Sequence, residues 1–260
     1  MFSGPAAMYD RFVGRYSPSL GRAMCEKAHV RPGQQALDVG CGSGALVEAL
    51  AAVVEPENVV GVDPSEPFVE AARARVPKAR IQVGSAESLP FADDDFDATL
   101  SQLVINFLAD PDRGLHEMSR VTRPGGVVAG CVWDYGGEMT MLRTFWDAAA
   151  ALDRERAAPM MEAHTMRFSR PDELEALWRS SGLEHVDVSA VVVEASYDDF
   201  DDLWAPFPTG VGPAGAYAAS LDDDARGRLR DEFARRLGQP GGSFTLSARA
   251  WCAVGRVAEA

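Results

Sequence analysis

Short apolar runs alternate with segments of helical periodicity through the first half of the chain. The apolar runs have the length of buried strands and lie at 35–40, 58–62, 80–83, 96–101 and 127–133. The segments between them carry apolar residues at helical spacing and end at turn signals such as Pro124-Gly125-Gly126. This alternation predicts right-handed crossovers and a mainly parallel sheet that is covered on both faces.

The pattern changes after Trp133. An amphipathic segment from 141 to 152 predicts a long helix in place of the next strand. Ser169 to Asp172 has the form of a capping box with an early proline, and it predicts a helix that ends at Gly182. The remaining segments predict a strand at 186–193, an irregular stretch at 197–215, a helix at 222–238 and, over 244–254, a half-exposed antiparallel strand at the end of the sheet.

These elements predict an α/β fold, with a doubly wound, mainly parallel seven-stranded sheet, an antiparallel terminal strand and a helical cap. The length of 260 residues is sufficient for one core with a cap. The expected parts are an N-terminal helical segment at 1–34, a binding core at 35–133, a cap insertion at 134–168, and the C-terminal half of the sheet at 169–260 with a second cap segment at 196–243.

The chain carries a formal net charge of −14, which argues against DNA, tRNA or rRNA as a partner because Lys and Arg supply most of the affinity for phosphates. Residues 1–14 lack a basic leader followed by an apolar stretch, and no apolar run has the length of a membrane span. Four cysteines form no Cys-x-x-Cys pair, and four histidines show no metal-ligand spacing. We therefore expect a cytoplasmic protein with reduced thiols, no metal and no membrane span.

The chemistry of the chain centres on a glycine turn that follows the first apolar run. Asp38 is followed by glycines at 40, 42 and 44, which allow a ligand to lie directly against the main chain. The spacing is Gly-x-Gly-x-Gly, with Ala45 where a dinucleotide fingerprint requires glycine. Asp63 ends the second run, where an acid can accept hydrogen bonds from both hydroxyls of a ribose; the alternative role is a helix cap before Pro64.

Further segments occur in a fixed order after this turn, at 84–91, 93–97, 101–102 and 120–126. Together with the turn and Asp63, they resemble the motifs of the class I S-adenosylmethionine-dependent methyltransferases over residues 36–133. The resemblance is greatest to the small-molecule branch that includes the ubiquinone and menaquinone biosynthesis methyltransferases. It implies a Rossmann-like fold, S-adenosyl-L-methionine as the cofactor and transfer of a methyl group to a small acceptor.

The resemblance also implies which residues bind the cofactor. Segment 84–91 resembles the adenine-binding segment of the family, the loop at 101–106 lies beside the methyl sulfonium, and segment 9–16 resembles an N-terminal segment that folds over the cofactor. The predicted cofactor-binding residues are Arg15, Tyr16, Asp38, Gly40, Cys41, Gly42, Gly44, Asp63, Pro64, Ser65, Ser85, Ala86, Glu87, Ser101, Gln102 and Leu103. Alternative roles are a solvated loop carboxylate for Glu87, a surface helix for Arg15 and Tyr16, and a small packing residue for Cys41.

In-line displacement at a sulfonium methyl requires alignment and exclusion of water rather than a fixed catalytic triad. A base for the acceptor could come from Asp134, Tyr135, Glu138, His164 or Tyr217. Aromatic residues of the cap fit either an apolar acceptor pocket or the core of the cap itself: Phe145, Trp146, Trp204, Phe207 and Tyr217. The alternatives are a nicotinamide-dependent oxidoreductase and a non-catalytic S-adenosylmethionine-binding protein. The acceptor, the methylated atom and the choice between monomer and homodimer stay open.

Overall fold

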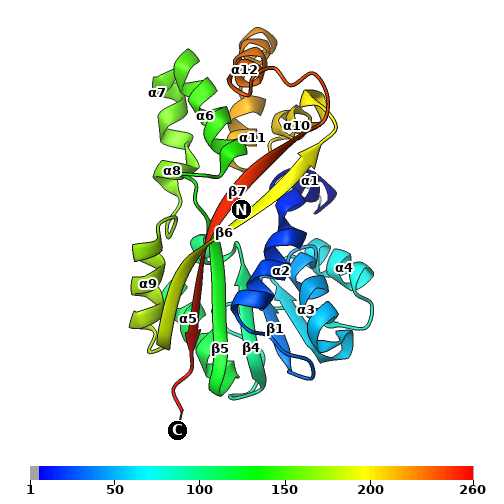
Figure 1. The fold of residues 1–260 in the computed structure, drawn as a ribbon, viewed down its shortest axis with the longest axis vertical. Helices are drawn as coiled ribbons and strands as arrows, with labels where there is room; N and C mark the ends of the chain where they lie inside the picture. Colours follow the sequence, from blue (N-terminus) through cyan, green and yellow to red (C-terminus); the bar gives the residue numbers. More distant parts are fainter. Residues whose placement is uncertain (1–5, 260) are drawn as a thin grey trace. The chain divides into compact units, whose positions relative to one another are not determined.

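Seven strands form one sheet within residues 6–259, the part of the chain that the computed structural model describes (Figure 1). The strand order is β3-β2-β1-β4-β5-β7-β6. The parallel strands are β1 (Ala36–Val39), β2 (Val59–Asp63), β3 (Arg80–Val83), β4 (Phe96–Gln102) and β5 (Thr122–Trp133). β7 (Phe244–Arg256) runs antiparallel to β5, and β6 (Glu184–Tyr197) lies next to β7 at the edge. The predicted mainly parallel α/β fold with an antiparallel last strand is confirmed.

The strand order reverses at β1, which separates two halves of the sheet. Leu37 of β1 is opposite Val60 of β2 on one side and Thr99 of β4 on the other. All four residues of β1 and all five of β2 are buried, which explains why both strands are continuous apolar runs in the sequence. At such a reversal the loops that leave neighbouring strands diverge, and the carboxyl edge there is the usual ligand-binding edge of an open α/β sheet.

The chain forms two compact units. The sheet unit comprises Ser17–Trp133, Arg167–Val191 and the segment from Ala250 onward. The helical unit comprises the N-terminal segment as far as Tyr16, together with Asp134–Met166 and Val192–Arg249. Strands β6 and β7 contribute residues to both units.

The sheet unit holds helices that precede or connect its strands. They are α2 (Ser17–Lys27), α3 (Ala45–Val54), α4 (Glu66–Arg75), α5 (Pro111–Val121) and α9 (Pro171–Ser180), with the 3₁₀ turns η2 (Pro56–Asn58) and η3 (Ile105–Phe107). α5 begins with Pro111 in its first turn, after Asp110, whose side chain accepts a hydrogen bond from the Arg113 N–H at 3.0 Å. Leu115, Met118 and Val121 form its buried face.

The helical unit holds helices of 4 to 14 residues around an aromatic core. Its helices are α1 (Ala6–Arg11), α6 (Thr140–Leu152), α7 (Arg154–Ala157), α8 (Glu162–Thr165), α10 (Phe200–Trp204), α11 (Gly212–Ala219) and α12 (Asp223–Arg236), and its 3₁₀ turns are η1 (Val13–Tyr16), η4 (Ala158–Met160) and η5 (Phe207–Thr209). Phe207 is fully buried and stacks on Phe145, with ring centroids 4.6 Å apart. Phe233 lies edge-on to both rings. The cap aromatics therefore pack against one another as the core of this unit.

Three details of the predicted elements are wrong. β7 lies between β5 and β6 rather than at the end of the sheet, and its alternation reflects one buried face, with Ala248 and Cys252 fully buried. α9 follows Arg170 without a side-chain cap, because Pro171 sets its first turn and leaves Ser169 one residue too early for a capping box. The stretch 197–215, predicted to be irregular, contains α10 and η5 and the start of α11.

No helix within residues 6–259 has the length and apolar character needed to cross a membrane. The cytoplasmic location of the protein stays a prediction.

Candidate cofactor site

The predicted cofactor-binding segments of the sheet unit follow four neighbouring strands. The glycine turn follows β1, Asp63 ends β2, Ser85 to Glu87 follow β3, and Ser101 to Leu103 end and follow β4. Because these strands are parallel, their carboxyl ends lie at one edge of the sheet. The fold thus brings these segments together at the edge where open α/β sheets bind their ligands.

The glycine turn is held to the end of β2 by backbone hydrogen bonds. The N–H groups of Gly40 and Cys41 both donate to the Val62 carbonyl, at 2.8 and 2.9 Å. Gly40, Gly42 and Gly44 have φ values of +76°, +50° and +88°, a region that side chains rarely adopt. A Cβ on Gly40 would lie 2.4 Å from a Val104 methyl group, whereas a Cβ on Gly42 would meet nothing within 4 Å. The turn is therefore packed at its start and open at its centre.

Asp63 braces this turn. One carboxylate oxygen accepts a hydrogen bond from the Gly42 N–H at 3.0 Å, and the other accepts one from the Ser65 N–H at 2.9 Å. Each oxygen has a further lone pair, so the carboxylate can accept two more hydrogen bonds. Burial raises the pKa of Asp63, and the two N–H donors oppose that shift. The Ser65 N–H belongs to the N-cap residue of α4, so Asp63 is not itself the cap of this helix, and its predicted ribose contact stays a prediction.

Asp38 is a buried acid without a partner. It is 1% exposed, and neither carboxylate oxygen has a hydrogen-bond partner among the described residues. Burial raises the pKa of Asp38 well above its ordinary value, and the nearby negative charge of Asp63 adds to the shift. The Val47 N–H, which makes no hydrogen bond of regular geometry to Asp38, opposes the shift without cancelling it. An uncompensated buried carboxyl group is costly, and a cationic ligand is one way to offset that cost. The ammonium group of S-adenosylmethionine fits this requirement.

The end of β4 uses its polar side chains mainly for internal contacts. The Ser101 hydroxyl donates to the Val39 carbonyl at 2.8 Å, and the Gln102 amide nitrogen donates to the Ser17 carbonyl at 3.2 Å. Leu103 has a φ of +63°, which is unusual for a residue with a branched side chain, and its N–H donates to the Cys131 carbonyl. Strained backbone of this kind persists where the surroundings fix it, and it is frequent at functional sites.

Comparison with known proteins identifies the family of this chain. Residues 37–130 match the family described as "Methyltransferase domain". The chain is 30% identical over 194 residues to the demethylmenaquinone methyltransferase of Symbiobacterium thermophilum, a match that covers 66% of this chain and 77% of that protein. The chain belongs to the class I S-adenosylmethionine-dependent methyltransferases. The cofactor of this family is S-adenosylmethionine, which agrees with the glycine spacing and disfavours the nicotinamide alternative.

Two further matches of this methyltransferase chain are, respectively, partial in sequence and distant. It is 38% identical over 112 residues to a 37.1 kDa protein of transposon Tn4556 from Streptomyces fradiae, which covers 42% of this chain and only 32% of that protein. In structure it resembles a protein of Anaeromyxobacter dehalogenans with a TM-score of 0.63 and 22% identity, over 94% of this chain and 98% of that one. The structural match supports the fold and no more.

In this methyltransferase the segment after β3 is folded onto itself and onto α5. The Glu87 N–H donates to the Ser85 hydroxyl at 3.2 Å, and a Glu87 carboxylate oxygen accepts from the Asp110 N–H at 2.9 Å. Ala86 is buried. The Glu87 carboxylate thus joins the segment to the start of α5, and its predicted contact with adenine stays a prediction.

Arg15 and Tyr16 belong to the helical unit, where both have defined partners. The Arg15 guanidinium pairs with Asp202, donates to the Ser196 carbonyl at 3.1 Å and lies 4.8 Å from the centre of the Tyr197 ring. The hydroxyl groups of Tyr16 and Tyr197 lie 3.2 Å apart, and burial raises the pKa of Tyr16. The predicted contacts of Arg15 and Tyr16 with the cofactor stay predictions.

The side chains considered as bases for the acceptor mostly have structural partners in the helical unit. Asp134 pairs with Arg249 at 2.6 Å and accepts a hydrogen bond from the Glu138 N–H, while the Glu138 carboxylate pairs with the same arginine at 2.9 Å. A His164 ring nitrogen lies 3.0 Å from the Ala158 carbonyl. Within residues 6–259 no group of three or more His, Cys, Asp or Glu side chains could hold a metal ion.

One buried acid escaped the sequence-based prediction. Glu162 is 3% exposed and accepts hydrogen bonds from the Trp146 indole N–H and, at 3.3 Å, from the Ala214 N–H. Burial raises the pKa of Glu162 to about 7. The residues next to Glu162 in the sequence, Met161 and Ala163, do not indicate that this acid is buried. Both of its hydrogen-bond donors come from other helices, so the contact becomes visible only in the fold.

Proposed function

We propose that this protein transfers a methyl group from S-adenosylmethionine to a small-molecule acceptor. The observation that carries the proposal is the pairing of an open glycine turn with two buried acids, the unpartnered Asp38 and the turn-bracing Asp63. The similar protein of Symbiobacterium thermophilum is named for methylation of demethylmenaquinone, a small molecule. The net charge of −14 is unfavourable for a nucleic-acid acceptor.

The proposed roles divide the cofactor among the segments of the site. Asp63 would accept hydrogen bonds from the ribose hydroxyls, and Asp38 would face the ammonium group of the amino-acid part. Ser85, Ala86 and Glu87 would contact the adenine. The remaining proposed contacts come from the turn and its neighbours Cys41, Pro64 and Ser65, and from the loop at Ser101, Gln102 and Leu103.

The cofactor supplies a methyl group on a positively charged sulfur, which is already a good leaving group. The protein then has to bind both reactants, orient the acceptor in line and exclude water. The aromatic rings of the helical unit pack with one another, so we do not assign them to an acceptor pocket. The proposed acceptor is a small molecule.

Isothermal titration calorimetry with S-adenosylhomocysteine tests the proposal. The wild-type protein should bind this product, and Asp63→Asn should bind it at least about tenfold more weakly, because hydrogen bonds to a charged group contribute about 1.5–3 kcal/mol. Asp112→Asn removes the same charge from an exposed position of α5 and should leave binding unchanged. Absence of binding to the wild-type protein would refute the proposed function. Turnover on a metabolite panel separates a transferase from a non-catalytic binder.

A further inference from the structure

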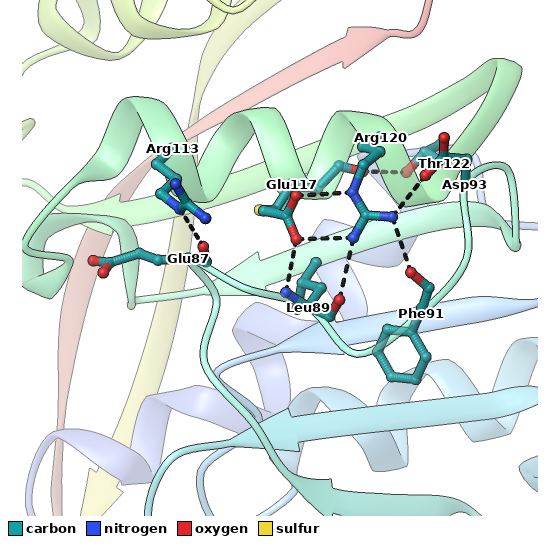
Figure 2. A network of polar contacts seen from close by, with 9 residues as sticks. Glu87, Leu89, Phe91, Asp93, Arg113, Glu117, Arg120 and Thr122 are labelled. Atoms are coloured by element: carbon teal, nitrogen blue, oxygen red, sulfur yellow. Dashed lines mark hydrogen bonds and ion pairs between the residues drawn. The ribbon is translucent and has the colours of Figure 1, made fainter.

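The segment after β3 is fastened to α5 by a pair of oppositely charged side chains (Figure 2). The Arg120 guanidinium donates to the Leu89 carbonyl at 3.1 Å, to the Phe91 carbonyl at 2.9 Å and to the Asp93 carboxylate at 2.8 Å. Its remaining bonds go to both carboxylate oxygens of Glu117, each at 2.8 Å. A single side chain thereby spans residues 89–93.

Glu117 is the acidic member of this pair, and we call Glu117 and Arg120 together the clamp. One of its carboxylate oxygens also accepts the Leu89 N–H at 2.8 Å, so Leu89 is held at its N–H by Glu117 and at its carbonyl by Arg120. The Glu117 side chain is 14% exposed, and hydrogen bonding from Arg120 lowers the pKa of its carboxyl group. Glu117 therefore stays ionised at neutral pH and keeps both kinds of contact.

A second fastening lies at the other end of the same segment. Arg113 donates from Nε to the Glu87 carbonyl at 2.6 Å, and the Glu87 carboxylate accepts the Asp110 N–H at the start of α5. Figure 2 shows Arg113, Glu117 and Arg120 reaching from one helix to successive points of the segment. Side chains of α5 thus hold the backbone at Glu87, Leu89 and Phe91, and the Asp110 N–H holds the Glu87 carboxylate.

We propose that Glu117 and Arg120 are positioning residues for the adenine part of the cofactor. This inference rests on the proposed function, in which Ser85, Ala86 and Glu87 contact the adenine. Those residues lie between the end of β3 and Leu89, and Glu87 is itself held by Arg113, so fixing Leu89 limits the conformations that the adenine-contacting backbone can adopt. A loop that is already ordered in its binding conformation avoids an ordering cost when the ligand binds.

Global stability is a weaker explanation for the clamp. Asp93 is 74% exposed, and exposed ion pairs contribute little to the free energy of unfolding. The less exposed pair of Glu117 with Arg120 lies within α5 at i, i+3 and does not by itself require the contacts with the segment. The geometry also requires arginine, because the fork serves two carbonyls and two carboxylates at once. A lysine ammonium in the same place has three donors on one atom and cannot reach all of these acceptors.

The experiment compares Arg120→Lys and Glu117→Gln with wild type. Binding of S-adenosylhomocysteine and of 5′-methylthioadenosine, which lacks the amino-acid part, is measured by calorimetry. We expect both ligands to bind about tenfold more weakly to each variant, because the lost order concerns the adenosine half that they share. Amide hydrogen exchange should accelerate at residues 85–93, while the melting temperature changes by less than about 4 °C.

Arg179→Lys is the matched control, since Arg179 forms an exposed pair with Glu175 on α9 at 2.7 Å and holds no loop. It should leave both affinities unchanged. If the wild-type protein binds both ligands and both clamp variants bind them with unaltered affinity, the positioning role is overturned and the proposed function stays intact. A loss confined to S-adenosylhomocysteine would also overturn it, and failure of the wild-type protein to bind either ligand would refute the proposed function itself. If Arg120→Lys fails to fold, Glu117→Gln alone decides the question.

Discussion

Two buried acids of this protein differ in how their surroundings receive a negative charge. Asp38 has no hydrogen-bond partner among the described residues, and the negative charge of its neighbour Asp63 raises its pKa further. Glu162 has two N–H donors, from Trp146 and Ala214, yet burial still raises its pKa. The first arrangement fits a site that a cation completes, whereas the second is a closed contact between helices of one unit.

Glu162 should make the stability of the helical unit depend on pH. In the unfolded chain its carboxyl group ionises near pH 4.5, whereas in the folded unit its pKa is about 7. Because the unfolded state releases the proton first, the free energy of unfolding should fall as pH rises from about 4.5 to 7, by about 3 kcal/mol. Urea unfolding followed by tryptophan fluorescence at several pH values measures this slope. Glu162→Gln should flatten it, and the exposed Glu155→Gln should not; equal slopes in the two variants would contradict the assignment.

At the scale of elements, alanine substitutions at two glycines can distinguish a loss of stability from a loss of ligand binding. Gly42 has a φ of +50° and open space where a Cβ would lie, and Gly182 has a φ of +79° with equally open space beyond α9. Alanine at either position should cost about 1–2 kcal/mol of stability, because both positions need left-handed backbone.

Only Gly42→Ala should also weaken binding of S-adenosylhomocysteine, by about tenfold or more, because its methyl group would point into the space that we assign to the ligand. Calorimetry on the two variants, with unfolding free energies for reference, makes the comparison. Equal affinities in both variants would show that the open space at Gly42 is not part of the binding site.

The elements themselves could be predicted where local pattern and tertiary packing agree. β3 has the predicted bounds, and α6 begins one residue early at Thr140, because buried runs and amphipathic periods are visible in the sequence. The helices α10 and α11 could not be predicted, since prolines and glycines around them resemble an irregular stretch and their packing partners lie elsewhere. The pairing of Asp134 with Arg249 spans 115 residues, so the sequence gives no reason to reject this acid as a base.

In the candidate site, too, some features could be predicted from the sequence and others could not. Its turn and strand-end residues follow from spacing, because consecutive parallel strands deliver them to one edge of the sheet. The clamp at Glu117 and Arg120 joins α5 to a segment nearly 30 residues earlier, and a helical Glu and Arg at i, i+3 ordinarily indicate a solvent-exposed pair. Such contacts become visible only with the fold.

At the scale of the whole molecule, the chain divides its apolar residues between two cores of different character. The sheet unit is built on aliphatic strands, such as the fully buried β1 and β2. The helical unit depends on aromatic stacking, with Phe207 between Phe145, Trp204 and Phe12 at centroid distances of 4.6, 5.6 and 4.9 Å. A defect in one core should therefore affect the two units unequally.

Phe207→Ala tests this separation. Removing a fully buried ring should destabilise the helical unit by about 3–5 kcal/mol, since the surrounding rings cannot close the cavity completely. Hydrogen exchange should then accelerate in α6, α11 and α12, while the amides of β1, β2 and β4 keep their protection, because their hydrogen bonds lie within the sheet unit. Leu152→Ala, at a position in α6 that is 47% exposed, should change neither set. Equal acceleration in both units would show that the chain unfolds as one cooperative unit, and the two cores would then have to be treated as a single folding domain.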